Sequence, residues 1–311
     1  MKKHNILLTG GSGFLGTALL QNVVFEDALV VGRTRPRYCK RFAFFDLSED
    51  CDLTHHLKGI DIVLHVAARA HVMSDNPDEA LDLYRDINTL STINLARQAA
   101  KSGVKRFIFL STIKVQGNET VGGKKFRNTD PVDPKDTYGI SKAEAEIGLK
   151  NIMDESDMEV VIIRPPLVYG AGVKGNFASL LKLVSKSLPL PFGSFKNRRS
   201  FVSVENLIDL ICQCLDHPNA RNQTFLVSDN HDLSTPELCR LLAETGGYKC
   251  HLFPFPAIIL RIFLNLLGKK AVYERLFGSS EVDISFTMTQ LNWRPPYKLE
   301  ESIANCWHNK N

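Results

Sequence analysis

Short apolar runs rich in β-branched residues alternate with helical patterns through the first half of the chain. The expected strands cover residues 5–9, 29–31, 41–45, 61–66, 106–110 and 160–164. The expected helices between them cover residues 14–24, 84–102 and 137–153. This alternation is typical of βαβ units, so we expect an α/β fold with a doubly wound parallel sheet that helices cover on both faces.

The pattern changes after Tyr169 to shorter elements. Helices are expected over residues 176–187, from Val204 and after Ser234, with a strand over 224–227. We therefore predict a large sheet domain over residues 1–168 and a smaller C-terminal α/β lobe over 169–311, with the chain crossing back between them. The longest loop, residues 118–136, is rich in Gly, Lys and Pro, and loops of this length usually carry function.

Composition limits the partners and the compartment. A chain of 311 residues with a formal net charge of +4, from 38 basic and 34 acidic residues, gives no electrostatic case for nucleic acid. The seven cysteines are an odd number without framework spacing, which favours free thiols in a reducing compartment. The chain runs from a short polar start straight into the first strand, without the long apolar segment of a secretion signal. We expect a cytoplasmic protein.

The most apolar stretch covers residues 253–267, with two prolines at its start and Arg261 and Asn265 within it. It is too short to span a bilayer, so no transmembrane segment is expected. Two interpretations stay open. The stretch is either a helix buried in the protein or against another subunit, or a contact with a membrane surface.

A glycine-rich turn follows the first strand and opens the first helix. Gly10, Gly13 and Gly16 allow a tight turn, close approach of backbone N–H groups to a pyrophosphate, and close packing of helix on strand. Phe14 and Leu15 begin the helix and join the glycines as candidate cofactor contacts. The turn therefore predicts a dinucleotide cofactor.

The spacing Gly-x-x-Gly-x-x-Gly resembles that of the extended short-chain dehydrogenase/reductase family, the NAD-dependent epimerases and dehydratases, and implies a Rossmann domain. Members that prefer NAD have an acidic residue after the second strand, whereas this chain has Arg33. A guanidinium suits a 2′-phosphate, so NADP(H) is favoured and NAD(H) is the alternative. The resemblance also implies cofactor contacts from Asp46, Leu47, Ala67 and Ala68. His65 is interpreted as a packing residue, and no group of His, Cys, Asp and Glu has convincing metal spacing.

Tyr138 and Lys142 stand four residues apart and therefore share one face of the predicted helix. The Thr112 hydroxyl is expected at the C-terminal end of the fifth strand, where open α/β sheets bind ligands. A nearby cation lowers the pKa of a tyrosine by stabilising its phenolate. By family resemblance Tyr138 is the general acid/base and Thr112 bonds the reacting oxygen. Lys142 tunes the tyrosine and holds the nicotinamide ribose.

Four further residues are candidates for binding the substrate. Lys114 follows Thr112 by two positions, so in an extended segment it would face the same side, and a solvated loop lysine is the alternative. Asn176 and Arg199 resemble the diphosphate-binding residues of UDP-sugar enzymes, and guanidinium binds phosphate through two parallel bonds. Arg275 is a candidate second phosphate contact. The basic run at 196–199 lacks the interleaved aromatics of a nucleic-acid surface.

The motifs most resemble those of bacterial enzymes that reduce the C4 ketone of a UDP-2-acetamido-2,6-dideoxyhexos-4-ulose. The implied product is UDP-N-acetylquinovosamine or its C4 epimer, for O-antigen, lipopolysaccharide or capsule synthesis. The alternative is a UDP-glucose or UDP-N-acetylglucosamine 4-epimerase with tightly bound NAD. Arg33, taken to lack a partner acid, favours an exchangeable cofactor and hence the reductase.

Other activities fit the motifs less well. A dehydratase is disfavoured because Ile113, and not an Asp-Glu pair, follows Thr112. A non-catalytic redox sensor on the same fold is disfavoured because Tyr138 and Lys142 are both present. The resemblance further implies a homodimer paired through the helices at 84–102 and 137–153.

Overall fold

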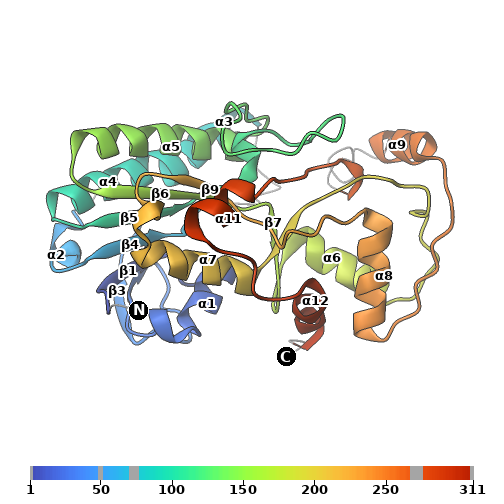
Figure 1. The fold of residues 1–311 in the computed structure, drawn as a ribbon, viewed down its shortest axis with the longest axis horizontal. Helices are drawn as coiled ribbons and strands as arrows, with labels where there is room; N and C mark the ends of the chain where they lie inside the picture. The colour runs from blue at the N-terminus through green and yellow to red at the C-terminus, as the bar shows by residue number, and fades with distance from the viewer. Residues whose placement is uncertain (1–2, 48–51, 70–76, 267–275, 309–311) are drawn as a thin grey trace.

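The computed structural model describes residues 3–47, 52–69, 77–266 and 276–308. Its main feature is a parallel sheet of seven strands in the order β3-β2-β1-β4-β5-β6-β9 (Figure 1). The strands are β1 (Ile6–Thr9), β2 (Leu29–Gly32), β3 (Arg41–Phe44), β4 (Ile62–His65), β5 (Arg106–Leu110), β6 (Glu159–Arg164) and β9 (Thr224–Leu226). The predicted doubly wound α/β fold is confirmed, and each of the six strands expected in the first half has a counterpart in the sheet.

Helices cover both faces of this sheet (Figure 1). On one face lie α1 (Phe14–Leu20), α7 (Val204–Asp216) and α11 (Ser285–Leu291), and on the other α2 (Thr54–Leu57), α4 (Ser91–Lys101) and α5 (Thr137–Glu155). Successive strand residues point to opposite faces, so Leu8 joins the first core and Leu7 the second. Strands that are buried on both faces read as continuous apolar runs, which is why the sequence predicted them well.

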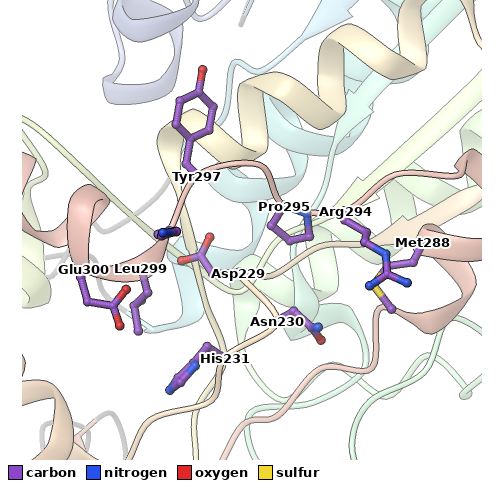
Figure 2. Close-up of a pocket in the computed structure, with 10 residues that line it drawn as sticks. Asp229, Asn230, His231, Met288, Arg294, Pro295, Tyr297, Leu299 and Glu300 are labelled. Atoms are coloured by element: carbon purple, nitrogen blue, oxygen red, sulfur yellow. The ribbon is translucent and has the colours of Figure 1, made fainter.

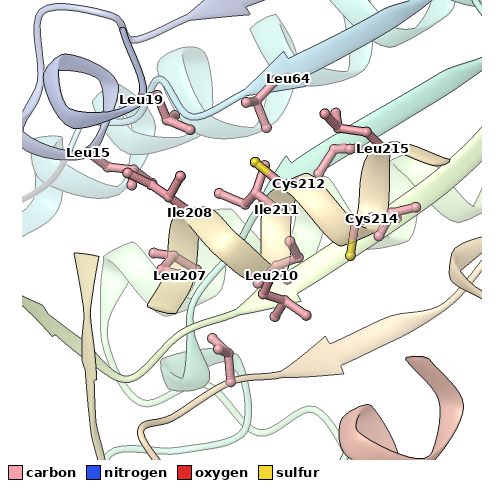
Figure 3. Close-up of a cluster of buried hydrophobic side chains, with 14 of the residues drawn as sticks. Leu15, Leu19, Leu64, Leu207, Ile208, Leu210, Ile211, Cys212, Cys214 and Leu215 are labelled. Atoms are coloured by element: carbon pink, nitrogen blue, oxygen red, sulfur yellow. The ribbon is translucent and has the colours of Figure 1, made fainter. Parts of the chain in front are cut away.

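The α7 helix packs its apolar side on α1 and the sheet (Figure 3). Leu15 and Leu19 of α1 meet this side of α7 in one buried cluster. Cys212 and Cys214 belong to the same cluster, and burial raises the pKa of both thiols to about 12. These two cysteines therefore act as small apolar residues of the core.

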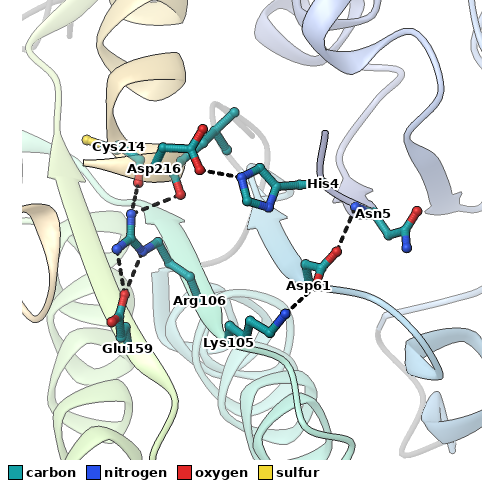
Figure 4. A network of polar contacts seen from close by, with 9 residues as sticks. His4, Asn5, Asp61, Lys105, Arg106, Glu159, Cys214 and Asp216 are labelled. Carbon is teal, nitrogen blue, oxygen red and sulfur yellow. Dashed lines mark hydrogen bonds and ion pairs between the residues drawn. The ribbon is translucent and has the colours of Figure 1, made fainter. Parts of the chain in front are cut away.

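A polar network fixes the C-terminal end of α7 to the starts of two strands (Figure 4). Arg106, the first residue of β5, donates hydrogen bonds to the carbonyl oxygens of Cys214 at 2.6 Å and Leu215 at 2.9 Å. The same guanidinium pairs with Glu159, the first residue of β6. The arginine thus satisfies carbonyl groups that a helix end leaves open. These contacts stabilise the N-terminal ends of the strands. The candidate site lies at the opposite, C-terminal ends.

Two predicted helices are interrupted. The helix expected over 14–24 ends at Leu20, and a 3-10 helix, η1 (Val23–Phe25), follows after Asn22 accepts a bond from the Val24 amide. The helix expected over 84–102 consists of a π-helix, η2 (Arg85–Leu90), between α3 (Pro77–Tyr84) and α4. Single π turns often mark functional positions, and η2 packs against the helix that carries Tyr138.

The segments after Tyr169 that do not pack on the large sheet form a smaller lobe around its own core. It contains a parallel pair of strands, β7 (Leu167–Tyr169) and β8 (Phe201–Ser203). Its helices are α6 (Gly175–Val184), α8 (Thr235–Gly246), α9 (Ala257–Leu266) and α12 (Leu299–His308), and η4 (Pro218–Ala220) connects α7 to β9. Because β9 returns to the large sheet, the boundary at 168/169 remains a proposed division, with the chain crossing back between the two parts.

The apolar stretch at 253–267 contains α9, whose outer face is open to solvent. Ile258 is 61% exposed and Leu266 81% exposed, so the interpretation of a helix buried within the chain is wrong. In the described part of the chain, no helix combines the length and the apolar character needed to cross a bilayer.

Candidate active site

The glycine-rich turn joins β1 to α1 with very close packing. A Cβ at Gly16 would lie 2.1 Å from the carbonyl oxygen of Gly10, and a Cβ at Gly10 would lie 2.6 Å from the Ala67 amide nitrogen. Gly10 also has a φ of +74°, a conformation that favours glycine. Gly13 begins α1 without a side-chain cap. The turn thus presents backbone alone at the helix start, which fits the pyrophosphate of a dinucleotide.

The side chains of the other expected cofactor contacts differ in how far they are exposed to solvent. The Leu15 side chain is buried in the α1–α7 core, so it offers a ligand only its backbone. Phe14 and Leu47 are partly buried and pack on the two cores, whereas Ala68 is exposed. The Ala67 amide donates to Thr9 Oγ1 at 3.3 Å, which ties the turn after β4 to the end of β1.

His65 holds the strand ends together beneath this region. Its Nδ1 lies 2.8 Å from Thr9 Oγ1 and its Nε2 lies 2.9 Å from Thr92 Oγ1. Complete burial, with Lys142 nearby, lowers the pKa of His65 to about 3, so the ring is neutral. His65 is a hydrogen-bonded packing residue, in agreement with the sequence interpretation.

Arg33 does have an acidic partner, which corrects the premise drawn from the sequence. Its Nε lies 4.0 Å from Asp46 Oδ1, and its side chain is 70% exposed. The two residues come from the ends of neighbouring strands, thirteen positions apart, so the sequence alone did not show their proximity. At Gly32 an added Cβ would meet no atom within 4 Å, which leaves open space beside this pair.

Tyr138 and Lys142 lie on the first turns of α5, which begins at a well-formed cap. Asp136 accepts a hydrogen bond from the Gly139 amide at 2.8 Å, as an N-cap aspartate does. The Tyr138 ring meets the ring of Tyr84 edge to face, with centroids 6.3 Å apart. Burial raises the pKa of Tyr138 above its ordinary value. The negative charges of Asp136 and of ionised Tyr84 act in the same direction with smaller effect.

Lys142 is almost completely buried, at 1% exposure. Its Nζ donates to the Leu110 carbonyl oxygen at 2.8 Å and lies 4.2 Å from the centroid of the Phe109 ring. Burial lowers the pKa of Lys142 to about 7, against the opposing charge of Glu146. The lysine is thus attached to the end of β5. Burial is the largest influence on the pKa of both Tyr138 and Lys142, so the expected lowering of the Tyr138 pKa by Lys142 stays a prediction.

Thr112 stands at the same end of β5 and begins a short 3-10 helix, η3 (Ile113–Val115). The segment is therefore helical and not extended, which corrects the geometric argument that placed Lys114 beside Thr112. Lys114 Nζ instead forms an ion pair of 2.5 Å with Asp136. The pair links η3 to the N-terminus of α5, and both side chains remain about one-third exposed, at 37% and 31%.

A buried ion pair supports this arrangement, and the sequence reasoning missed it. Arg164, at the end of β6, donates to both carboxylate oxygens of Glu146 at 3.0 and 2.5 Å. Ser111 Oγ donates to the same carboxylate at 2.5 Å. The two charged side chains are 3% and 2% exposed. The available signal was the position of Glu146, four residues after Lys142 on the same helix face.

The π-helix η2 contributes a second support that the sequence did not reveal. Asn88 Nδ2 donates to Ser141 Oγ at 3.0 Å, and Thr89 Oγ1 donates to the Ser141 carbonyl at 2.7 Å. Asn88 also accepts from the Arg69 amide at 2.8 Å. Asn88 thereby connects the chain after β4 with the helix of Tyr138 and Lys142.

Asn176 and Arg199, two of the four predicted substrate residues, lie in the smaller lobe. Asn176 is exposed in the first turn of α6. Arg199 is half-buried, and its Nη1 donates to the Gly278 carbonyl at 2.9 Å. Within the described residues Arg199 has no ion-pair partner, and burial lowers its pKa. Glu119 lies close enough to act on its charge but makes no salt bridge with it, so the half-buried guanidinium keeps donors that suit a phosphate. Arg275 lies outside the described residues.

The smaller lobe and α11 also line a pocket of about 340 Å³ (Figure 2). Its lining includes Asp229 and Arg294, but none of the predicted site residues. The Asp229 carboxylate is already used, because it accepts bonds from the Tyr169 hydroxyl at 2.7 Å and from Asn206 at 2.7 Å. We therefore place the candidate active site at the strand ends and not in this pocket.

Known proteins resemble the chain over nearly its whole length. Residues 6–228 match the NAD dependent epimerase/dehydratase family. A Vibrio cholerae protein named UDP-glucose 4-epimerase is 49% identical over 305 residues, covering 96% of this chain and 93% of that protein. An Escherichia coli O157:H7 N-acetyl-alpha-D-glucosaminyl-diphospho-ditrans,octacis-undecaprenol 4-epimerase is 30% identical over 268 residues, covering 85% and 77%. The Bordetella bronchiseptica enzyme WbmG, solved with NAD and UDP, has a TM-score of 0.77 at 21% identity, covering 99% and 96%.

Proposed function

Since the chain belongs to the NAD dependent epimerase/dehydratase family, we propose that it inverts C4 of a UDP-hexose by reversible oxidation at that carbon, with NAD as cofactor. The observation that carries the proposal is the convergence of Tyr138, Lys142 and Thr112 at the end of β5. In the sheet only β4 separates β5 from β1, and the glycine-rich turn follows β1 at the same carboxyl end of the strands, which supports a shared ligand site there. The name of the Vibrio cholerae relative supports an epimerase over a reductase.

In this proposal NAD, when bound, supplies the hydride acceptor at C4. Gly10, Gly13 and Gly16 hold its pyrophosphate, and the small residues Ala67 and Ala68 line its path. Tyr138 takes the proton of the sugar O4 hydroxyl during oxidation and returns it during reduction. Thr112 hydrogen-bonds the same oxygen.

Lys142 has two proposed roles. It binds the nicotinamide ribose, and in its charged form it stabilises the Tyr138 phenolate. A pKa of about 7 leaves the lysine able to gain or lose its proton near neutral pH. Its bond to the Leu110 carbonyl fixes the ammonium group for both roles.

The substrate is held through its diphosphate. Arg199 supplies a half-buried guanidinium that forms no salt bridge within the described residues, although Glu119 acts on its charge, and the exposed Asn176 supplies an amide. Lys114 is a candidate contact to the sugar. To make that contact, its ammonium group would leave the ion pair with Asp136. A site that binds diphosphate also suits a sugar that is linked through diphosphate to a polyprenol, the substrate type in the name of the Escherichia coli relative. UDP-sugars and polyprenol-diphosphate sugars should therefore both be assayed.

Arg33 and Asp46 support NAD over NADP. A carboxylate 4.0 Å from the guanidinium opposes a 2′-phosphate at that position, and it can accept bonds from ribose hydroxyls. The 70% exposure of the Arg33 side chain still leaves its charge accessible. For that reason a reductase of UDP-4-keto-6-deoxy sugars that uses exchangeable NADPH is the second candidate.

Two measurements on the purified protein separate these candidates. Released nucleotide is first identified by mass spectrometry, and UDP-glucose, UDP-N-acetylglucosamine and the 4-keto sugar nucleotide are then incubated separately with it. The proposal predicts bound NAD and an equilibrium mixture of C4 epimers without change in absorbance at 340 nm. Stoichiometric oxidation of NADPH by the 4-keto substrate, without epimerisation of either UDP-sugar, would establish the reductase instead.

A further inference from the structure

Glu146 and Arg164 are buried charged residues that have no part in the proposed reaction. Their side chains are 2% and 3% exposed. Burying two charges costs solvation energy, and replacing such a pair by apolar residues of similar volume is often neutral or stabilising. Stability alone therefore does not account for this ion pair. Its contacts with the end of β5 indicate a second role.

The ion pair lies against the residues that precede Thr112 in the chain. Lys142 Nζ donates to the Leu110 carbonyl at 2.8 Å, and Ser111 Oγ donates to the Glu146 carboxylate at 2.5 Å. Lys142 and Glu146 are four positions apart and both buried on α5, so they share one face of that helix. This face therefore holds the two residues at the end of β5.

The end of β6 holds the same segment through the backbone. The Ser111 amide donates to the Ile163 carbonyl at 2.8 Å, and the Ile113 amide donates to the Pro165 carbonyl at 2.9 Å. The residue between these two acceptors is the arginine of the buried ion pair. Thr112 thus stands between two neighbours that are both fixed to β6, and one of them is also bound to the carboxylate of the pair.

Glu146 also acts on Lys142 through its charge. Burial lowers the pKa of Lys142 to about 7, and the Glu146 carboxylate opposes that decrease. A charge acts more strongly on its neighbours in a buried site than in water. The carboxylate thus favours the ammonium form of the lysine, which is the form that stabilises a Tyr138 phenolate.

Other charged side chains on the elements around α5 have different partners or lie in solvent. Among the described side chains, the paired ones are Arg85 with Glu144, Lys114 with Asp136 and Arg106 with Glu159, and the exposed ones are Asp82, Asp86, Arg97 and Lys101. His65 of β4 is neutral, because its pKa is lowered to about 3. In this part of the described chain, Glu146 is therefore the buried carboxylate that can support a charge on Lys142.

We propose that Glu146 is a positioning residue of the candidate active site. Through Ser111 it fixes the segment that carries Thr112. Through its charge it keeps the buried lysine of the same helix face protonated. Glu146 itself touches neither substrate nor cofactor. The effect on turnover rests on the proposed function, whereas the effect on the lysine can be measured without any turnover.

The protonation of Lys142 tests the charge effect directly. The protein is labelled with lysine that carries ¹³C at Cε, and its NMR signals are followed from about pH 5 to about pH 10. The signal that is missing in Lys142→Met identifies this residue. We expect its titration midpoint to fall by at least about one pH unit in Glu146→Gln. The matched control is Glu144→Gln, at the partner of Arg85 on the same helix, which should leave the midpoint unchanged.

Steady-state kinetics test the effect on position. Ser111→Ala removes the hydroxyl that binds the carboxylate and leaves the ion pair in place, so the fold should persist. We expect kcat to fall about tenfold with an unchanged KM for the UDP-sugar, because the proposed diphosphate contacts lie in the smaller lobe. In Glu146→Gln the alkaline decline of kcat should also move to lower pH, by the shift that NMR gives. A purely structural role would not move it.

An unchanged Lys142 midpoint in folded Glu146→Gln would overturn the charge effect, and a wild-type kcat in Ser111→Ala would overturn the effect on position. If Glu146→Gln does not fold, the double variant Glu146→Gln, Arg164→Met leaves no lone buried charge and should show the same fall in the midpoint. A wild-type protein that converts no sugar nucleotide would refute the proposed function. The NMR titration would then still decide the role of Glu146.

Discussion

The Lys142 ammonium donates a hydrogen bond of 2.8 Å to the carbonyl oxygen of Leu110, the last residue of β5. This contact joins the helix of Tyr138 to the strand that leads to Thr112. Two proposed catalytic side chains from α5 and one that follows β5 therefore keep a fixed relation to one another. The predictions below test what that relation does.

Removing the Tyr138 hydroxyl should abolish turnover and leave the fold intact. Tyr138→Phe deletes the proposed acid/base, and loss of such a group lowers kcat by about 10²–10⁴-fold. The ring and its contact with Tyr84 remain, so the thermal midpoint should change little. Tyr38→Phe, at an exposed tyrosine, is the control. A folded Tyr138→Phe protein with wild-type kcat would exclude the role.

Lys142 should make stability depend on pH in the alkaline range. Its pKa is about 7 in the folded chain, below the ordinary value of 10.5. The unfolded chain binds more protons between these values, so the free energy of unfolding should rise from pH 7 to pH 10. In Lys142→Met that rise should be smaller by about 3–4 kcal/mol, because the variant has no amine that titrates at this position.

Urea unfolding at pH 7 and pH 9.5 measures this difference. Lys101→Met, at an exposed lysine in the last turn of α4, is the matched control and should follow the wild type. Parallel pH profiles for the wild type and Lys142→Met would show that Lys142 does not change its protonation in this range.

Breaking the buried ion pair should destabilise the chain more than removing it. Glu146→Gln leaves Arg164 charged and buried, at a cost of about 3–5 kcal/mol in the free energy of unfolding. The double variant Glu146→Gln, Arg164→Met should lose less than the sum of the two single variants. Equilibrium unfolding in urea gives all four values. Additive losses would mean that the two residues act independently.

Arg199 should contribute to substrate binding more than its neighbour does. Arg199→Ala should raise KM for the UDP-sugar by about 10–100-fold, because a charge-assisted bond to phosphate is lost. Arg198→Ala removes an exposed arginine that pairs with Glu237, and KM should stay near the wild-type value. Steady-state kinetics decide the matter, and equal changes in the two variants would argue against a diphosphate site at Arg199.

Features that depend on local pattern could be predicted from the sequence. The buried strands read as apolar runs, and the spacing of Tyr138 and Lys142 placed both on one face of α5. Features that depend on distant partners could not be predicted. The π-helix at Arg85–Leu90 is fixed by contacts from Asn88 and Thr89 to Ser141, more than fifty positions later in the chain.

Charged pairs show the same limit. Lys114 was placed by assuming an extended segment, but the segment turns into η3 and the lysine reaches Asp136. Arg33 was taken to lack an acid, but parallel pairing of β2 with β3 brings Asp46 close. Both errors concern partners that only the folded chain brings together.

The account rests on hydride transfer at C4 through a bound cofactor, and turnover in D₂O tests this most directly. A UDP-hexose is brought to equilibrium with its C4 epimer in D₂O, and the product is examined by mass spectrometry and NMR. We predict epimerisation without deuterium at C4, because the hydride returns from the cofactor and only O4 exchanges its proton with Tyr138. Deuterium at C4, or turnover that persists in Tyr138→Phe, would contradict the account.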